Sequence, residues 1–269
     1  MAALPEYEVF ALKYGSVMRG RAENILRGDP HDMAPDPLDY FIWVARGAGR
    51  TVVVDTGFGD AEAKRRNRQR TIEPADALKL VGVDAAEVEE VIISHLHYDH
   101  AGCLDAFPKA RFHVQEDEMR YATGRHMCHT CIRQAYAVED VVQLVRAVYG
   151  GRVAFHDGDA ELAPGLSLHR IGGHTMGMQS VRVHTRRGWV VLASDASHMY
   201  ANMETGMPFP IVHDMTETLE GYQTLRRLAA SPRHIVPGHD PRVLRRYPAP
   251  TPGLAGIVAR LDVDPSDAA

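Results

Sequence analysis

Residues 94–102 read SHLHYDHAG, where the apolar segment 91–94, which is typical of a short strand, gives way to a loop. Within six positions this stretch contains three histidines and one aspartate: His95, His97, Asp99 and His100. Nitrogen ligands combined with an oxygen ligand suit zinc and similar divalent cations. A loop also lets all four side chains turn toward one point, so the stretch predicts a metal site.

Three other polar residues follow apolar strands in the same way. They are His174 in IGGHTMG, Asp195 in VVLASDA and His239 in IVPGHD. Strand ends that meet at one sheet edge place loop residues together on a rigid scaffold. The glycines beside His174 and His239 permit the tight backbone that such loops need. We therefore expect these three side chains to join the histidines of the first segment.

Composition indicates an ordinary globular protein and excludes several classes of partner. The chain has 269 residues, of which 45% are hydrophobic and 24% charged, which favours one large domain. A net charge of -5 argues against a nucleic acid partner, because Lys and Arg supply the affinity for phosphates. No apolar run is long enough to span a membrane, which argues against a membrane partner. Three cysteines fit a reducing compartment, so we expect a cytoplasmic protein, and the 15 histidines direct attention to metals.

Hydrophobic patterning predicts alternating strands and helices. Strands are expected at residues 8–13, 38–45, 51–55, 91–94, 111–115, 166–171, 180–185, 189–194 and 234–236. Helices are expected at residues 74–81, 116–122, 138–149 and 216–229. The two β-rich halves suggest two sheets covered by helices, with loops gathered at one edge. We expect a single domain over 1–269, in which 123–151 forms a cap and 249–269 a flexible tail.

A basic cluster and a cysteine-containing segment leave alternatives open. The cluster at residues 64–70 is interpreted as a solvated face, with a binding patch as the alternative. The segment containing His126, Cys128, His129 and Cys131 is interpreted as a loop over the site, although it could also bind metal or cycle its redox state. With the loop 203–210 it would shape an apolar acyl or aromatic pocket. Either loop could also make a homodimer contact.

Taken together, these segments resemble the metallo-β-lactamase superfamily. Its hallmark is His-x-His-x-Asp-His followed by a distant His, an Asp and a final His, and the segment VDTG at 54–57 belongs to the same resemblance. The resemblance covers nearly the whole chain and implies an α/β fold. In that fold, an αββα sandwich, two mixed β-sheets are flanked by helices.

The resemblance also implies a dinuclear metal centre. His95, His97 and His174 would hold one metal, Asp99, His100 and His239 the other, and Asp195 would bridge the two. Two zinc ions per chain are expected, with manganese, iron or cobalt as alternatives. Asp55 would hold the ligand loop through hydrogen bonds, or it could simply form the turn at a strand end.

Within the superfamily, the chain is most similar to the N-acyl homoserine lactonases and the related pyridoxolactonase. HLHYDHAG, GHTMGMQS, SDAS and PGHD carry this similarity. Too few residues follow His239 for the helical domain of glyoxalase II, and Asp99 stands where several zinc β-lactamases have cysteine. These lactonases have a substrate-binding tyrosine three residues after the bridging aspartate. Here His198 occupies that position and Tyr200 lies two further on, which is a departure from the lactonase pattern.

The expected function is hydrolysis of a lactone, a small-molecule substrate, by attack of a metal-bridging hydroxide. Asp99 would protonate the departing alkoxide, and His198 or Tyr200 would stabilise the oxyanion. The lactone would be an acyl homoserine lactone signal, which makes the enzyme quorum-quenching, or a lactone from ring catabolism. A hydrolase of another cyclic amide, lactam or thioester is the alternative. A phosphodiesterase and an iron redox protein are further alternatives.

Overall fold

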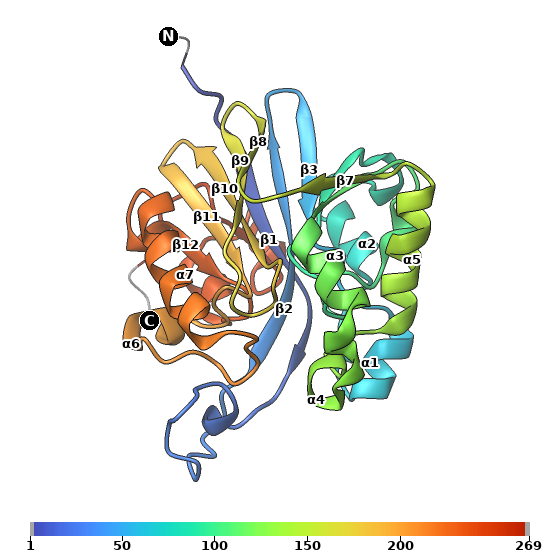
Figure 1. The fold of residues 1–269 in the computed structure, drawn as a ribbon. Helices are drawn as coiled ribbons and strands as arrows, with labels where there is room; N and C mark the ends of the chain where they lie inside the picture. The colour runs from blue at the N-terminus through green and yellow to red at the C-terminus, as the bar shows by residue number, and fades with distance from the viewer. Residues whose placement is uncertain (1–2, 267–269) are drawn as a thin grey trace.

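A computed structural model describes residues 3–266. Two β-sheets lie face to face in the middle of the molecule, and helices cover the outer side of each sheet (Figure 1). The predicted αββα sandwich with two mixed sheets is therefore confirmed.

The first sheet has eight strands and is mixed. Strands β1, β2 and β3 pair antiparallel, whereas β3, β5, β6 and β7 run parallel. Its order is β13 (Val258–Arg260), β1 (Glu8–Val17), β2 (Leu38–Gly47), β3 (Arg50–Val54), β5 (Glu90–Ile92), β6 (Arg111–Gln115) and β7 (Val153–His156), with β4 (Gln69–Arg70) paired to β1.

The second sheet has five strands. Its order is β12 (Ile235–Pro237), β11 (Gly188–Ser194), β10 (Gln179–Thr185), β9 (Leu166–Arg170) and β8 (Ala160–Ala163). Only β11 and β12 pair parallel, and the other neighbours are antiparallel. Strands β9 and β11 therefore point the same way, since each is antiparallel to β10.

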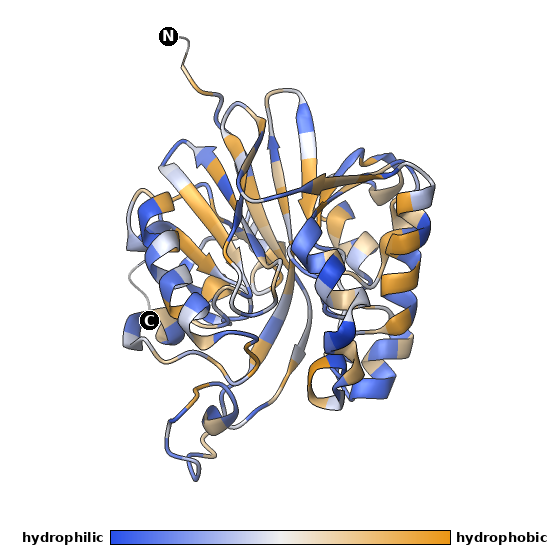
Figure 2. Ribbon diagram, in the orientation of Figure 1, coloured by the Kyte–Doolittle hydropathy of each residue, from blue (hydrophilic) through white to orange (hydrophobic). Residues whose placement is uncertain are grey.

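Both faces of the first sheet are buried, as β2 illustrates. Its odd-numbered residues Phe41 and Trp43 face the core between the sheets, whereas Tyr40 and Ile42 face the core under the helices. Because side chains alternate across a strand, a strand buried on both faces reads as a continuous apolar run. Figure 2 shows the resulting concentration of hydrophobic residues in the central strands.

The helices fall into two groups, one for each sheet (Figure 1). Those on the side of the first sheet are α1 (Asp60–Arg66), α2 (Pro74–Lys79), α3 (Glu116–Thr123), α4 (Thr130–Arg133) and α5 (Val138–Tyr149). Those on the side of the second sheet are α6 (Tyr200–Thr205), α7 (Met215–Leu228) and α8 (Arg242–Arg246). Short 3-10 turns occupy η1 (Arg21–Glu23), η2 (Ala85–Glu87), η3 (Leu104–Ala106), η4 (Arg125–Cys128), η5 (Pro232–His234) and η6 (Pro252–Leu254).

Two expectations about segments need correction. The prediction of a flexible tail is wrong for residues 249–266, because β13 pairs with β1 and Leu261 is fully buried. Residues 267–269 lie outside the described part of the chain. The segment 123–151 is a cap only in its first half, since Leu144 and Ala147 of α5 pack in the core of the first sheet. Cys131, Ile132, Gln134 and Ala135 instead line the cavity over the site described below.

Among residues 3–266, no helix combines the length and the apolar character that crossing a membrane requires. The cytoplasmic location expected from the cysteine content stays a prediction.

Candidate metal centre and active site

The site forms where several strands end at the same sheet edge. The loop after β5 carries His95, the connection from β9 to β10 carries His174, and Asp195 and His239 follow β11 and β12. Parallel neighbours such as β11 and β12 release their loops at one edge. All seven side chains expected as ligands are buried there and make up two of the three overlapping groups of metal-type donors among the described residues; the third joins His198 to Asp195 and His239.

The first group consists of three imidazoles and one carboxylate. Nε2 of His174 lies 3.2 Å from Nε2 of His95 and 2.9 Å from Nδ1 of His97. Oδ2 of Asp195 lies 3.3 Å from the same nitrogen of His174 and 3.8 Å from Nε2 of His95. Bonds of about 2.0–2.1 Å to zinc place tetrahedral ligand atoms about 3.3 Å apart, so this spacing fits a divalent cation.

The second group shares the same aspartate. Oδ1 of Asp195 lies 2.9 Å from Nε2 of His239 and 3.4 Å from Nε2 of His100. Oδ2 of Asp99 lies 3.8 Å from each of those nitrogens. A Cβ at Gly238 would lie 2.6 Å from Oδ1 of Asp195, so glycine keeps room beside this carboxylate. The two oxygens of Asp195 thus face different groups.

Burial favours the neutral imidazole at His95 and at His97. Burial, together with the nearby rings of His100 and His97, holds the pKa of His95 well below its usual value. Burial and His174 hold the pKa of His97 well below its usual value in the same way. Neutral histidine is the form that binds metals, because the coordinating nitrogen needs its lone pair.

Hydrogen bonds on the far side of the rings set which nitrogen faces the site. Nδ1 of His174 donates to the carbonyl of Ile211 over 2.6 Å. Nδ1 of His239 donates to the carbonyl of Asp39 over 2.8 Å. Because Nδ1 is turned to a backbone carbonyl, Nε2 is the nitrogen of each ring that faces the site, as it is in a metal ligand.

Asp55 orients His100 in the same way, by accepting a hydrogen bond from its Nδ1. Its carboxylate accepts from Nδ1 of His100 at 2.7 Å and from the backbone N–H of Ser94 at 2.7 Å. The hydroxyl of Ser94 also donates to Asp55, at 2.8 Å, and the hydroxyl of Ser194 donates to that of Ser94 at 2.9 Å. This chain of bonds joins β3, β5 and β11, so Asp55 both shapes a strand end and orients a ligand-type histidine.

A cavity of about 750 Å³ opens over the two groups. Its lining includes the donor residues His97, Asp99, His174, Asp195 and His239. The buried site is therefore reachable by a small molecule.

These features match a known family. The profile of the metallo-beta-lactamase superfamily fits residues 35–239. This chain belongs to the metallo-beta-lactamase superfamily. In a member of this superfamily, two clusters of His and Asp donors point to bound divalent metal.

Two curated proteins and one solved structure to which this chain is similar are named as lactonases. N-acyl homoserine lactonase AiiB of Agrobacterium fabrum is 35% identical over 136 residues, 47% of each chain. An N-acyl homoserine lactonase of a Bacillus species is 32% identical over 165 residues, 61% of this chain and 60% of the relative. This chain thus spans about half to three fifths of the length of these relatives. The crystal structure of a quorum-quenching N-acyl homoserine lactone lactonase matches 89% of this chain and 94% of its own, with a TM-score of 0.74 and 25% identity.

His198 lies within the metallo-beta-lactamase site but faces Asp195. Its Nε2 is 2.9 Å from Oδ2 of Asp195, and its ring stacks on Phe209 with centroids 3.4 Å apart. Burial lowers the pKa of His198 to about 3, against the opposing effect of Asp195. A neutral ring that donates its Nε2–H to a carboxylate has no second N–H to offer a substrate.

Tyr200 does not reach the site. It begins α6, is buried, and has the guanidinium of Arg246 4.5 Å from its ring centroid. Its backbone N–H donates to Asp240, and the ring does not line the cavity. The oxyanion role expected for Tyr200 therefore has no geometric support.

A pair of phenols that sequence reasoning missed lies beside the second donor group. The hydroxyls of Tyr40 and Tyr98 are 3.0 Å apart, and both residues line the cavity. The ring of Tyr40 is 5.4 Å from that of His239, and Nε of Arg68 donates to the hydroxyl of Tyr98. Burial raises the pKa of Tyr40 to about 12, so it stays protonated near neutrality. The position of Tyr98 inside the histidine-rich stretch was the only feature of the sequence that could have pointed to this pair of phenols.

Glu118 was also missed, although it connects two ligand loops. Its fully buried carboxylate accepts from the backbone N–H groups of Leu96 and Gly177 and from the hydroxyl of Thr175. These partners flank His95 on one loop and His174 on the other. A glutamate in the first turn of a short helix carries no sequence sign of such a role.

The cysteine-containing segment contributes to the cavity wall. Cys128 and Cys131 are free and exposed, and Cys131 lines the cavity. Within residues 3–266, no group of metal-type donors includes these cysteines, His126 or His129. The interpretation as a loop over the site agrees with this placement.

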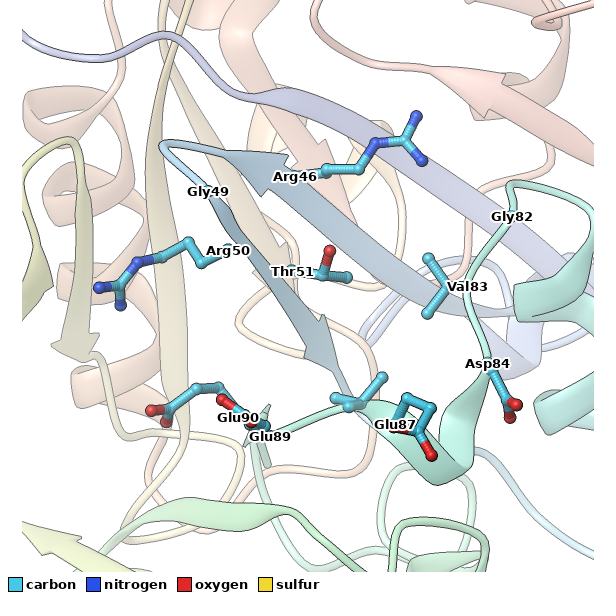
Figure 3. Close-up of a pocket in the computed structure, with 11 residues that line it drawn as sticks. Arg46, Gly49, Arg50, Thr51, Gly82, Val83, Asp84, Glu87, Glu89 and Glu90 are labelled. Carbon is cyan, nitrogen blue, oxygen red and sulfur yellow. The ribbon is translucent and has the colours of Figure 1, made fainter.

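A second hollow, of about 470 Å³, has a different character (Figure 3). It lies at the start of β3 and β5, at the opposite end of these strands from the donor groups. Side chains of both charges line it, including Arg46, Arg50, Glu87, Glu89 and Glu90. Nothing there resembles a catalytic arrangement.

Proposed function

We propose that this protein is a hydrolase that opens a lactone ring at a centre of two divalent cations, each expected to be zinc. The observation that carries the proposal is the position of Asp195, whose two oxygens each face a separate group of buried donors. The lactonase names of the curated relatives support the choice of substrate class.

The residues present fit two cations. His95, His97 and His174 would hold one, and Asp99, His100 and His239 the other, with Asp195 between them. Oδ1 of Asp195 and Nε2 of His100 are buried without a well-aligned hydrogen bond among the described residues, as vacant ligand atoms would be. When bound, two cations sharing a water ligand lower its pKa toward neutrality and polarise a carbonyl oxygen.

Asp99 is suited to proton transfer. Its carboxylate lines the cavity beside His100 and His239, and its backbone carbonyl is held by the hydroxyl of Tyr14 at 2.7 Å. This bond restrains the backbone of Asp99, whose side chain lines the cavity. There it would accept a proton as the ring is attacked and return it to the departing alkoxide.

The phenols of Tyr40 and Tyr98 would bind the developing oxyanion. Arg68 donates to Tyr98, and only one of the two phenols donates to the other. One phenolic O–H therefore remains for a ligand in the cavity, whichever way the pair is arranged. His198 would then act indirectly, by orienting Asp195.

The lactone would be an acyl homoserine lactone signal or a lactone from ring catabolism. Tyr121, Ile132, Pro210 and Ile211 form an apolar part of the cavity that suits an acyl chain or an aromatic ring. Another small cyclic amide, lactam or thioester is the alternative, because the same chemistry opens these acyl bonds.

Metal analysis and a substrate panel test the proposal together. We expect two zinc ions per chain. With proton release as the assay, we expect lactones to be turned over faster than lactams, thioesters and phosphodiesters. Chelation should abolish turnover and lower the melting temperature, and added zinc should restore both. Turnover of phosphodiesters alone, or iron with visible absorption in place of zinc, would overturn the proposal.

A further inference from the structure

One wall of the cavity over the donor groups is strongly basic. Arg19, Arg65, Arg66 and Arg68 line the cavity, and three of them belong to the cluster expected to be a solvated face. The carboxylates in the lining are those of Asp99 and Asp195, and both belong to the donor groups. The lining thus holds no carboxylate outside the donor groups that could pair with these arginines.

Two of the four arginines already have acidic partners. Glu62 accepts from Arg65 at 2.6 Å and from Arg66 at 2.7 Å. Arg66 also donates to the carbonyls of Gln134 and Tyr136, which fastens α1 to the segment that covers the cavity. These two side chains are structural and lend the wall little free charge.

Arg19 and Arg68 differ from them. Among the described residues, neither forms an ion pair, and Arg68 is held only by its bond from Nε to the hydroxyl of Tyr98, 3.3 Å long. Both line the cavity together with Tyr40, and Gly15 of β1 pairs with Tyr40 on one side and with Arg70 on the other, which brings the three segments together. Two partly exposed arginine side chains thus line the same cavity as the phenols of Tyr40 and Tyr98.

We propose that Arg19 and Arg68 bind an oxyanion of the substrate, a carboxylate or a phosphate, so that the preferred substrate is an anionic lactone. The inference rests on the proposed lactonase function. Guanidinium groups present paired N–H donors that match both of these anions. A substrate with an uncharged acyl chain would offer no partner to the guanidinium groups of Arg19 and Arg68.

The placement of the wall also orients the substrate. Tyr40 contacts His239, so the basic wall adjoins the second donor group. The carbonyl of Ile211 accepts from His174, so the apolar wall adjoins the first group. The anionic arm of the lactone would therefore lie on the side of Asp99, and its apolar part on the side of His97.

Kinetics with matched substrates test the inference. The substrates are γ-butyrolactones carrying a carboxylate, a phosphate ester or an uncharged methyl amide at the same position. The wild type should show kcat/KM about tenfold or more higher for an anionic lactone than for the amide, mainly through KM. Comparison of the carboxylate with the phosphate identifies which anion is preferred. The preference should shrink as salt is added.

Variants assign the preference to the two arginines. Arg19→Gln, Arg68→Gln and the double variant should reduce the ratio of anionic to uncharged turnover toward one. Arg19→Lys and Arg68→Lys should retain part of it, because the charge remains. Lys64→Gln is the matched control, since Lys64 belongs to the same basic cluster but is exposed and does not line the cavity. It should leave the ratio unchanged.

Calorimetry gives a readout independent of turnover. Tetrahydrofuran carrying a carboxylate or a phosphate ester should bind the metal-loaded protein about tenfold more weakly in the double Gln variant. A preference that survives in the double variant, or no advantage of the anion in the wild type, would overturn the inference while leaving the lactonase function intact. If no lactone is opened, the proposed function fails, and equal binding by the wild type and the double variant would still overturn the inference.

Discussion

Nδ1 of His100 donates to Oδ2 of Asp55 over 2.7 Å, between residues 45 positions apart in the sequence. Asp55 has a φ of 63°, a left-handed conformation that turns its carboxylate from the end of β3 toward the loop after β5. The bond leaves Nε2 of His100 as the atom that faces Asp195. The backbone turn at the end of β3 therefore orients His100, a donor in the loop that follows β5.

Asp55→Asn should weaken the second metal position. Asparagine tolerates the left-handed backbone, but its amide cannot accept all the bonds from Ser94 and His100. We expect about 10–100-fold weaker retention of one of two metals, and a similar loss of lactone turnover. Metal content after dialysis against graded chelator measures this. The exposed Asp157→Asn is the control, and unchanged retention would contradict the role of Asp55.

Removal of the two phenols should slow the chemical step. Tyr40→Phe combined with Tyr98→Phe should lower kcat about 100-fold with metal content unchanged, because a hydrogen-bond donor to the oxyanion is lost. Tyr200→Phe is the matched control, since Tyr200 is equally buried but lies outside the cavity. If Tyr200→Phe lowered kcat and the double variant did not, the assignment would be reversed.

Glu118→Gln should loosen both ligand loops. The amide can accept through one atom only, so at least one of the N–H and O–H donors from Leu96, Thr175 and Gly177 loses its partner. Loss of a buried partner costs about 1–3 kcal/mol in the free energy of unfolding. Urea unfolding measures this, and hydrogen exchange should quicken in residues 94–102. The exposed Glu116→Gln, two residues earlier in α3, should change neither.

Asp140 should make stability depend on pH. Burial, reinforced by Glu62, raises the pKa of Asp140 from 3.8 to about 7. The folded protein then holds this proton more tightly than the unfolded chain, so stability falls as pH rises between these values. Asp140→Asn should stabilise the protein by about 1–2 kcal/mol at pH 8 and by much less at pH 5.

The difference between Asp140→Asn and the wild type is the quantity to measure, by urea unfolding at both pH values, because metal ligands titrate equally in the two proteins. Asp157→Asn controls for the loss of a surface charge. An equal difference at pH 5 and pH 8 would refute the raised pKa of Asp140.

Most strands and helices could be predicted from the local pattern of hydrophobic residues. β2 is buried on both faces and alternates between two cores, so its apolar run identifies it without knowledge of its neighbours. β13 was missed because three residues, Val258–Arg260, carry too little pattern to separate a strand from a tail. Only pairing with β1 makes that segment a strand. The basic residues of α1 were interpreted as a surface, although Arg66 reaches the cavity wall.

The residues of the candidate metal centre could be picked out from the sequence alone. His95, Asp195 and His239 are recognisable because their residue types and their positions after apolar strands are local properties. The surroundings of these donor residues, in contrast, became visible only in the folded chain. Arg19, Tyr40 and Arg68 belong to separate segments and meet at one wall through the pairing of β1 with β2 and β4. Their shared position depends on contacts between distant parts of the chain, which no single stretch of sequence encodes.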